Sequence, residues 1–156
     1  MPLQSRKKWK VVYVDSHMKS KNCGPEKAFD DNPKSHWHTE WAPKKPKPPH
    51  EIQIDMGEEL TVCGLTILPR QDKLPNGIIT QYEFYVSNDT KNWGKISMQG
   101  LLKSSKKNRS QQIIYFKDKD KNALTVKGRY IRLVAIKGHR NMPFTSLAEL
   151  NVIIEE

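Results

Sequence analysis

Apolar and polar residues alternate along much of this 156-residue chain, with a period near two instead of the roughly 3.6 of a helix. In the segment 51–56, for example, every second residue is apolar. Alternation and short β-branched runs predict strands over 9–14, 51–56, 62–68, 82–87, 112–116, 129–136 and 148–154. Turn dipeptides such as Met56-Gly57 lie between the predicted strands. The pattern indicates an all-β sandwich or barrel, with at most one short helical turn over 26–29.

The length of the chain fits one domain. Residues 1–8 are basic, and we expect them to be disordered or to derive from an expression vector, with a single domain over 9–156. The proline-rich stretch 42–49 is interpreted as an extended loop inside that domain. No run approaches the roughly 18 apolar residues of a membrane-spanning helix, and no apolar secretion signal follows the basic start.

The chain is basic, with 27 Lys and Arg against 17 Asp and Glu and a formal net charge of +10 at pH 7. Such a charge favours attraction to polyanions but does not determine the fold. The lysines are scattered and no nucleic-acid-binding motif accompanies them, so nucleic acid is not the expected partner. Of the two cysteines, we expect Cys23 to be exposed in a polar loop and Cys63 to be a reduced core residue.

Three segments together carry a family likeness. They are 28–41 (AFDDNPKSHWHTEW), the stretch from 49 through 94, and 129–150, which begins RYIRL and ends PFTSLAEL. In order and spacing, the chain resembles the coagulation factor V/VIII C-type (discoidin) superfamily and, within it, family 32 carbohydrate-binding modules. The likeness runs from about residue 9 to residue 154 and implies a discoidin-like jelly-roll β-sandwich.

The same resemblance implies a sugar-binding site. In similar galactose-binding members, the His of Trp-His-Thr, the Arg of Pro-Arg-Gln and a following Asn contact the sugar, which implies these roles for His38, Arg70 and Asn76. Trp41 and Phe144 match positions where the family places aromatic rings against the sugar. Each residue also has an ordinary structural interpretation, such as an Asn-Gly turn at 76–77. Their joint occurrence favours a site with hydroxyl-pairing groups and an apolar wall.

One loop departs from the family pattern. Galactose-binding relatives often carry an acidic residue before Ala28, whereas the loop 16–24 of this chain is basic and has no carboxylate. Such a loop would suit a sugar that bears a carboxylate or a sulfate, or a neutral sugar held by fewer contacts.

The resemblance also implies a structural calcium ion. Oxygen atoms would come from the polar loop 27–35 and from the start of the last strand, at Lys27, Asp30, Asn32, Ser35, Ala148 and Glu149. Calcium prefers about 6–8 oxygen ligands, including backbone carbonyls. The alternative is an Asx-turn at Asp30 with Glu149 in a salt bridge.

The sequence has no nucleophile elbow, zinc-protease motif or phosphate loop, so we expect binding and not catalysis. The expected function is recognition of a terminal galactose-type sugar (galactose or N-acetylgalactosamine) or a related glycan. The domain would be a monomer, excised from a multidomain glycosidase that is secreted or on the cell surface. Within that glycosidase, the domain would target the enzyme to its substrate. The alternative is an adhesion module that binds anionic polysaccharide or phospholipid through its basic charge, although only Met18 and Met142 offer apolar loop tips.

Overall fold

The computed structural model describes residues 2–155 and confirms the predicted all-β fold. Its strands are β1 (Lys10–Val14), β2 (Trp37–His38), β3 (His50–Leu68), β4 (Ile79–Ser87), β5 (Met98–Leu101), β6 (Gln112–Tyr115), β7 (Val126–Gly138), β8 (Ser146–Leu147) and β9 (Glu149–Ile154). The helical segments are three short 3-10 turns, η1 (Lys19–Lys21), η2 (Pro25–Ala28) and η3 (His139–Asn141). Within residues 2–155, none of them has the length and apolarity that a membrane crossing requires.

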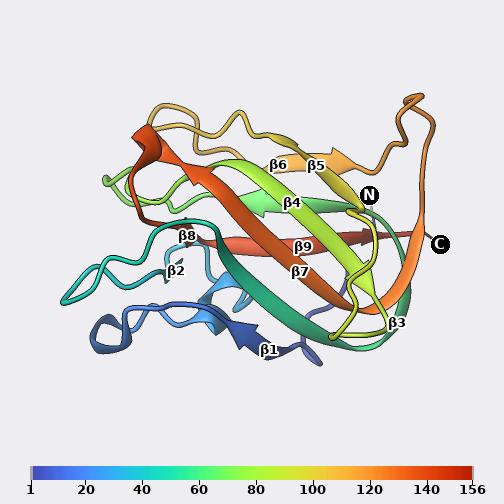
Figure 1. The fold of residues 1–156 in the computed structure, drawn as a ribbon, viewed down its shortest axis with the longest axis horizontal. Helices are drawn as coiled ribbons and strands as arrows, with labels where there is room; N and C mark the ends of the chain where they lie inside the picture. The colour runs from blue at the N-terminus through green and yellow to red at the C-terminus, as the bar shows by residue number, and fades with distance from the viewer. Residues whose placement is uncertain (1, 156) are drawn as a thin grey trace.

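A bend in β3 creates the two layers of the sandwich (Figure 1). Its first half belongs to a layer with the order β1-β3-β7-β4-β5, and its second half pairs with β6 and β9 in the other layer. The pairing with β7 shifts register between Asp55 and Leu60, around Gly57, whose φ is +85°. The predicted strands 51–56 and 62–68 are therefore one strand, because the turn signal at Met56-Gly57 marks this bend and not a chain reversal.

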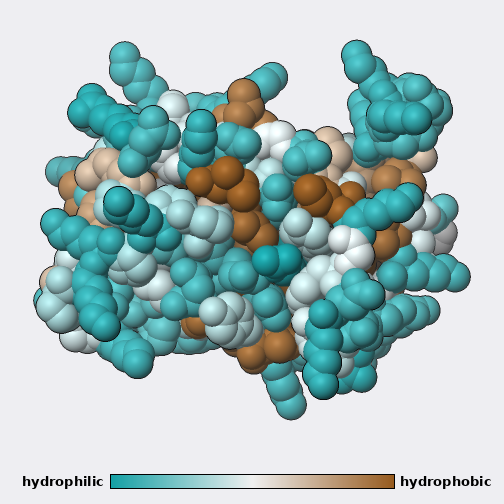
Figure 2. Space-filling model, viewed as in Figure 1, coloured by the Kyte–Doolittle hydropathy of each residue, from teal (hydrophilic) through white to brown (hydrophobic). Residues whose placement is uncertain are grey.

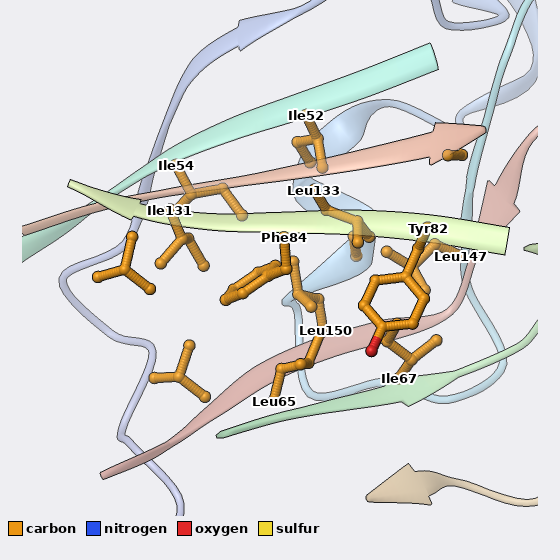
Figure 3. Packing of buried hydrophobic residues seen from close by; sticks show 14 of the residues in the cluster. Ile52, Ile54, Leu65, Ile67, Tyr82, Phe84, Ile131, Leu133, Leu147 and Leu150 are labelled. Atoms are coloured by element: carbon orange, nitrogen blue, oxygen red, sulfur yellow. The ribbon is translucent and has the colours of Figure 1, made fainter. Parts of the chain in front are cut away.

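The hydrophobic core fills the space between the two layers (Figure 3). Ile52, Phe84 and Leu133 point from the first layer, and Leu65 and Leu150 point from the second. All five are essentially inaccessible to solvent. The alternation read in the sequence therefore corresponds to inward-facing positions of antiparallel strands.

The N-terminal segment differs from the expectation. Residues 2–6 lie along β9, where Leu3 bridges Ile153 and Gln4 accepts a 3.0 Å hydrogen bond from the Asn151 amide. Arg6 reaches the carbonyl oxygen of Leu150 at 3.0 Å. Residues 2–8 are thus an ordered part of the domain, while residue 1 is outside the described residues. Sequence patterns could not predict this, because the segment is held by contacts to residues about 140 positions away.

The loop 16–24 is also more buried than predicted. Cys23 is 7% exposed and Met18 is 8% exposed, although both were expected at the surface. The backbone of the loop bonds to β2 from both sides, because Met18 donates to the His38 carbonyl at 2.9 Å and His38 donates to the Cys23 carbonyl at 3.1 Å. Cys63 is half-buried, so it is not the full core residue expected, and both thiols are free.

Five loops gather at one end of the sandwich, drawn on the left in Figure 1 and opposite the marked chain ends. They cover residues 15–24, 39–49, 69–78, 102–111 and 139–145. On the face drawn in Figure 2 most of the surface is hydrophilic, and hydrophobic groups form small separate patches. The five loops bring segments that are distant in sequence together at this end of the sandwich.

Candidate functional site

The five residues predicted to bind sugar line one pocket of about 420 Å³ at the loop end. They are His38, Trp41, Arg70, Asn76 and Phe144. His36, Lys45 and Leu74 complete its wall. Three segments that are distant in sequence therefore converge on one cavity.

The short strand β8 holds these segments together. Ser146 pairs with His38 of β2 on one side and bridges Ile78 on the other. Its backbone N–H donates to the Gly77 carbonyl at 2.8 Å, and its hydroxyl donates to the Asn76 carbonyl at 2.9 Å. Phe144 lies two residues before Ser146. The pairing of β8 therefore determines how the three pocket-lining segments lie relative to one another.

Gly77 permits this close approach. Its φ is +87°, and a Cβ atom at this position would lie 2.6 Å from the backbone nitrogen of Ser146. A side chain would therefore force the Asn76 loop away from β8. The Asn-Gly pair is a turn, as its ordinary interpretation holds, and it also places Asn76 at the pocket.

Arg70 is 5% exposed and its guanidinium has a fixed orientation. Nε and Nη2 each donate a 2.7 Å hydrogen bond to the Asp72 carboxylate, and Nη1 donates to the Asn76 carbonyl at 2.9 Å. These bonds use three of the five guanidinium hydrogens and leave two for a ligand. The Arg70 guanidinium also holds the pKa of Asp72 below its ordinary value.

His38 is 4% exposed and is held as a neutral hydrogen-bond acceptor. Its Nδ1 lies 2.7 Å from the Thr39 carbonyl oxygen, so Nδ1 carries the hydrogen and Nε2 keeps its lone pair. Burial, with a smaller contribution from the positive charge of Arg70, lowers the pKa of His38 to about 4. The imidazole is therefore uncharged at physiological pH.

Two aromatic rings lie next to the imidazole of His38. The ring centroid of Trp41 lies 4.7 Å away in an edge-on arrangement, and that of Phe144 lies 5.7 Å away. Trp41 is partly exposed, so it can present an apolar surface to a ligand in the pocket. Polar groups and aromatic surface in one pocket suit a ligand with hydroxyls and a C–H face.

A buried ion pair supports the Phe144 wall from behind. His50 is fully buried, with Nδ1 2.8 Å from the Asp15 carboxylate and Nε2 2.7 Å from the Pro143 carbonyl. Both partners can accept hydrogen bonds, so the contacts favour a hydrogen on each ring nitrogen, which is the imidazolium form. Burial opposes this charge, but the bonds to Asp15 and Pro143 outweigh it and raise the pKa of His50.

Sequence reasoning missed three residues of the pocket wall. His36 could have been found, because the alternation around the buried Trp37 places His36 and His38 on the same side. Lys45 lies in the proline-rich loop and Leu74 in a polar loop, and neither has a local pattern that predicts its position. Only the fold of the loops brings them to the pocket.

The residues predicted to hold calcium lie in the segment 27–35 and at the start of the last strand. Asp30 accepts hydrogen bonds from the Asn32 backbone, at 3.1 Å, and from the Ser35 hydroxyl. The Asp30 carboxyl group also lies against that of Glu149, at the start of β9. Lys27 is in η2, which contacts β9, and Ala148 directly precedes Glu149.

The Glu149 carboxylate has an unsatisfied oxygen. Arg6 pairs with Oε2, while Oε1 is buried and has no hydrogen-bond partner among residues 2–155. Burial, with Asp30 beside it, raises the pKa of Glu149 to about 7 despite Arg6. A buried, unpartnered carboxylate oxygen next to a second carboxylate fits a cation.

Most of the predicted calcium ligands are neutral oxygens. No cluster of three His, Cys, Asp or Glu side chains suited to a metal occurs in residues 2–155, and the predicted set contains only two carboxylates. The other four positions would supply backbone, amide or hydroxyl oxygens. Arg6, which also pairs with Asp31, already supplies one positive charge here and was not predicted from the sequence.

Comparison with known proteins identifies the family. The F5/8 type C domain matches residues 12–150, which is most of the chain. The chain belongs to the F5/8 type C family. The sequence resemblance and the discoidin-like fold are therefore confirmed.

Relatives of this F5/8 type C domain include much longer enzymes. Galactose oxidase of Gibberella zeae is 40% identical over 152 residues, which cover 95% of this chain and 20% of the oxidase. The sialidase of Micromonospora viridifaciens is 31% identical over 144 residues, which cover 91% of this chain and 21% of the sialidase. The chain thus spans about a fifth of the length of these relatives.

Its structural neighbours are family 32 carbohydrate-binding modules of bacterial glycoside hydrolases. CpGH89CBM32-5 from Clostridium perfringens, solved with GalNAc-beta-1,3-galactose, has a TM-score of 0.82 at 26% identity and covers 97% of this chain and 99% of its own. CBM32-3 from a family 31 glycoside hydrolase of the same organism has a TM-score of 0.84 at 25% identity and covers 98% and 95%.

Proposed function

We propose that this F5/8 type C domain is a non-catalytic carbohydrate-binding module that holds a terminal galactose-type sugar, galactose or N-acetylgalactosamine, in the pocket. The observation that carries the proposal is the convergence of an oriented Arg70, a neutral His38 and the Trp41 ring on one cavity. The GalNAc-beta-1,3-galactose bound to CpGH89CBM32-5 supports the ligand class.

The polar groups complement adjacent sugar hydroxyls. Arg70 has two free N–H donors for hydroxyl oxygens, and Nε2 of His38 accepts from a hydroxyl hydrogen. The Asn76 carbonyl is engaged by Arg70 and Ser146, which leaves its side-chain amide to donate and accept. Trp41 and Phe144 would receive the C–H face of the ring.

The carboxylate that pairs with Arg70 of the pocket is unsuited to acid catalysis. Asp72 is paired with Arg70 through both oxygens, and its pKa is held below the ordinary value. A general acid needs a raised pKa and a glycosidase needs two carboxylates across the scissile bond. Binding without chemistry is the role that these contacts favour.

An open site with a few hydrogen bonds and one ring contact should bind weakly, with a Kd of about 0.01–1 mM. Weak binding is useful when a module tethers an enzyme to a surface with many copies of the sugar. We propose that the domain is a monomeric part of a secreted glycoside-active enzyme and targets it to its substrate.

We also propose that calcium binds between the segment 27–35 and β9, held by Asp30, Asn32, Ser35 and Glu149 side chains and by the Lys27 and Ala148 carbonyls. The unpartnered Oε1 of Glu149 supports this. The ion would tie the loop that leads to His38 to the last strand and take no part in chemistry.

Isothermal titration calorimetry tests the sugar proposal. We expect galactose and N-acetylgalactosamine to bind, with glucose and mannose at least tenfold weaker. Arg70→Lys should weaken binding about tenfold, because lysine cannot reproduce the oriented fork. Arg129→Lys is the matched control, since Arg129 makes a similar pair with Asp55 at a distance from the pocket. Equal binding of glucose, or no effect of Arg70→Lys, would reject the proposal.

The membrane alternative has less support. Of the two apolar residues expected at loop tips, Met18 is buried and only Met142 is partly accessible. Insertion of loop tips into a bilayer needs several exposed apolar side chains, and in the described loops of this end Leu74, 55% exposed, is the one large apolar residue that is mostly exposed. Sedimentation with phosphatidylserine vesicles, without competition by galactose, would revive this function.

A further inference from the structure

A second groove lies beside the sugar pocket. It has a volume of about 640 Å³ and runs between the loop 42–49 and the end of β7. Lys45 lines both cavities, and the neighbouring residues Pro143 and Phe144 line one cavity each. Both flanking segments are at the loop end of the sandwich (Figure 1). A ligand of more than one sugar unit could therefore extend from the pocket into the groove.

The groove is lined by positive charge and, among the described residues, by no carboxylate. Lys45, Lys47 and Lys137 contribute to its wall, and none of them forms an ion pair within residues 2–155. Positive charge continues at η3, where the cations Arg140, Lys106 and Arg109 lie near His139. Burial and these charges together lower the pKa of His139. In the adjoining pocket, Asp72 is neutralised by Arg70. The potential over this end of the domain is therefore positive.

Part of the groove lining is apolar. Ile136, Met142 and Pro143 line the groove together with the lysines. Apolar lining can receive the C–H face of a sugar ring, and lysine ammonium groups pair with an anionic substituent without demanding one geometry. This combination distinguishes the groove from a general basic surface, which would have no apolar lining.

We propose that the groove is a subsite for an acidic sugar residue, one that bears a carboxylate or a sulfate ester and is linked to the terminal sugar in the pocket. The inference rests on the proposed function and narrows its substrate class to acidic glycans. Lys47 and Lys137 contact the acidic residue, and Lys45 lies at the boundary between the two subsites.

Three disaccharides that share a terminal galactose test the subsite. They are lactose, lactose with a sulfate ester on the glucose unit, and β-galactosyl-1,4-glucuronic acid, which differs from lactose by one carboxylate. We expect calorimetry at low salt, about 0.01 M, to give one or both acidic ligands at least a tenfold lower Kd than lactose. The acidic ligand that binds more tightly identifies the anionic group, and the advantage should vanish at about 1 M salt.

Variants assign the effect to the groove. Lys47→Gln with Lys137→Gln should remove the preference for the acidic ligands and leave lactose affinity unchanged, because neither lysine lines the sugar pocket. Lys119→Gln with Lys121→Gln makes the same charge change in the loop between β6 and β7, and should leave the preference intact apart from a small long-range loss.

The outcomes separate the two proposals. Equal affinities for all three ligands, or a preference that survives the Lys47 and Lys137 substitutions, would overturn the subsite and leave the proposed function standing. If none of the three ligands binds, and neither galactose nor N-acetylgalactosamine does, the proposed function fails and the subsite fails with it.

Discussion

Asp72 orients Arg70 by accepting hydrogen bonds of 2.7 Å from both Nε and Nη2. The pair is asymmetric, because the Arg70 side chain is nearly buried whereas the Asp72 side chain is 45% exposed. The arginine faces the pocket and the aspartate faces the solvent at its rim. Asp72 therefore acts on a ligand through the guanidinium that it positions.

Asp72→Asn should weaken sugar binding about tenfold with little change in folding. The amide keeps the shape but loses the charge and one of the two acceptors, so Arg70 is less firmly oriented. Titration calorimetry measures the affinity, and thermal unfolding checks the fold. Asp55→Asn, which disrupts the comparable pair with Arg129, should leave affinity unchanged. Unaltered affinity in Asp72→Asn would show that Arg70 needs no partner.

Sugar binding should be insensitive to pH from 8 to about 5 and should be lost as the pH falls through about 4, the pKa of His38. Protonation removes the Nε2 acceptor and places a positive charge beside Arg70. Of the groups facing His38, Arg70 and His36 lower its pKa, whereas Asp72 and the Thr39 carbonyl raise it. Calorimetry of the folded protein at stepped pH measures the midpoint.

His38→Gln is the control for this midpoint, since glutamine has an acceptor but does not titrate, and its residual affinity should be flat with pH. A binding midpoint that persists in His38→Gln would assign the titration to another group.

The titration of His38 also affects stability. An unfolded histidine titrates near 6.5, so acidification from about 6.5 to 4 should reduce the free energy of unfolding by up to about 3 kcal/mol.

His50 should show the opposite pH dependence, because its pKa is raised. Its contribution to stability is fully present below about 6.5 and is lost as the pH rises through the folded pKa. Asp15→Asn removes the carboxylate that stabilises the imidazolium. Urea unfolding from pH 6 to 9 should therefore give wild type an advantage that shrinks as the pH rises. Parallel curves would mean that His50 is neutral and bonds to only one partner.

Calcium should raise the thermal unfolding midpoint. At a hundredfold excess over Kd, a bound ion adds about 2.7 kcal/mol, which corresponds to roughly 5–10 °C in a domain of this size. Asp30→Asn and Glu149→Gln should each abolish the shift. Asp31→Asn, which changes a neighbouring carboxylate that pairs with Arg6, should retain it. Identical midpoints with calcium and with a chelator would leave the Asx-turn and the Arg6 ion pair as the whole explanation.

Local pattern predicted the long strands because a period of two is visible over five or more residues. It could not predict β2 and β8, which have two residues each and no measurable period. Yet β8 determines which loops meet. The sequence placed His38 and Arg70 in the right segments only through the family resemblance, and their burial depends on contacts across the fold. The position of Lys45 at the pocket and the ion pairs of Arg6 depend on contacts across the fold alone, so no local pattern predicts them.

Gly77→Ala should damage both the fold and the pocket. Its φ of +87° is unfavourable for alanine, and the added Cβ would meet the Ser146 nitrogen at 2.6 Å. Gly94→Ala separates these two effects. Gly94 has a φ of +67°, and a Cβ added there would meet no atom of the described residues within 4 Å beyond its chain neighbours. Gly94→Ala should lower the free energy of unfolding by about 1–2 kcal/mol, because only the unfavourable backbone conformation of alanine contributes.

We expect Gly77→Ala to lose more than Gly94→Ala in urea unfolding, and to bind galactose at least tenfold more weakly because Asn76 is displaced from β8. Gly94→Ala should bind galactose normally, since it lies in the loop between β4 and β5, away from the pocket. Equal losses in the two variants would mean that the Asn76 loop can move away from Ser146 without strain. Normal galactose binding by Gly77→Ala would then show that the contact between Gly77 and β8 is not what positions Asn76.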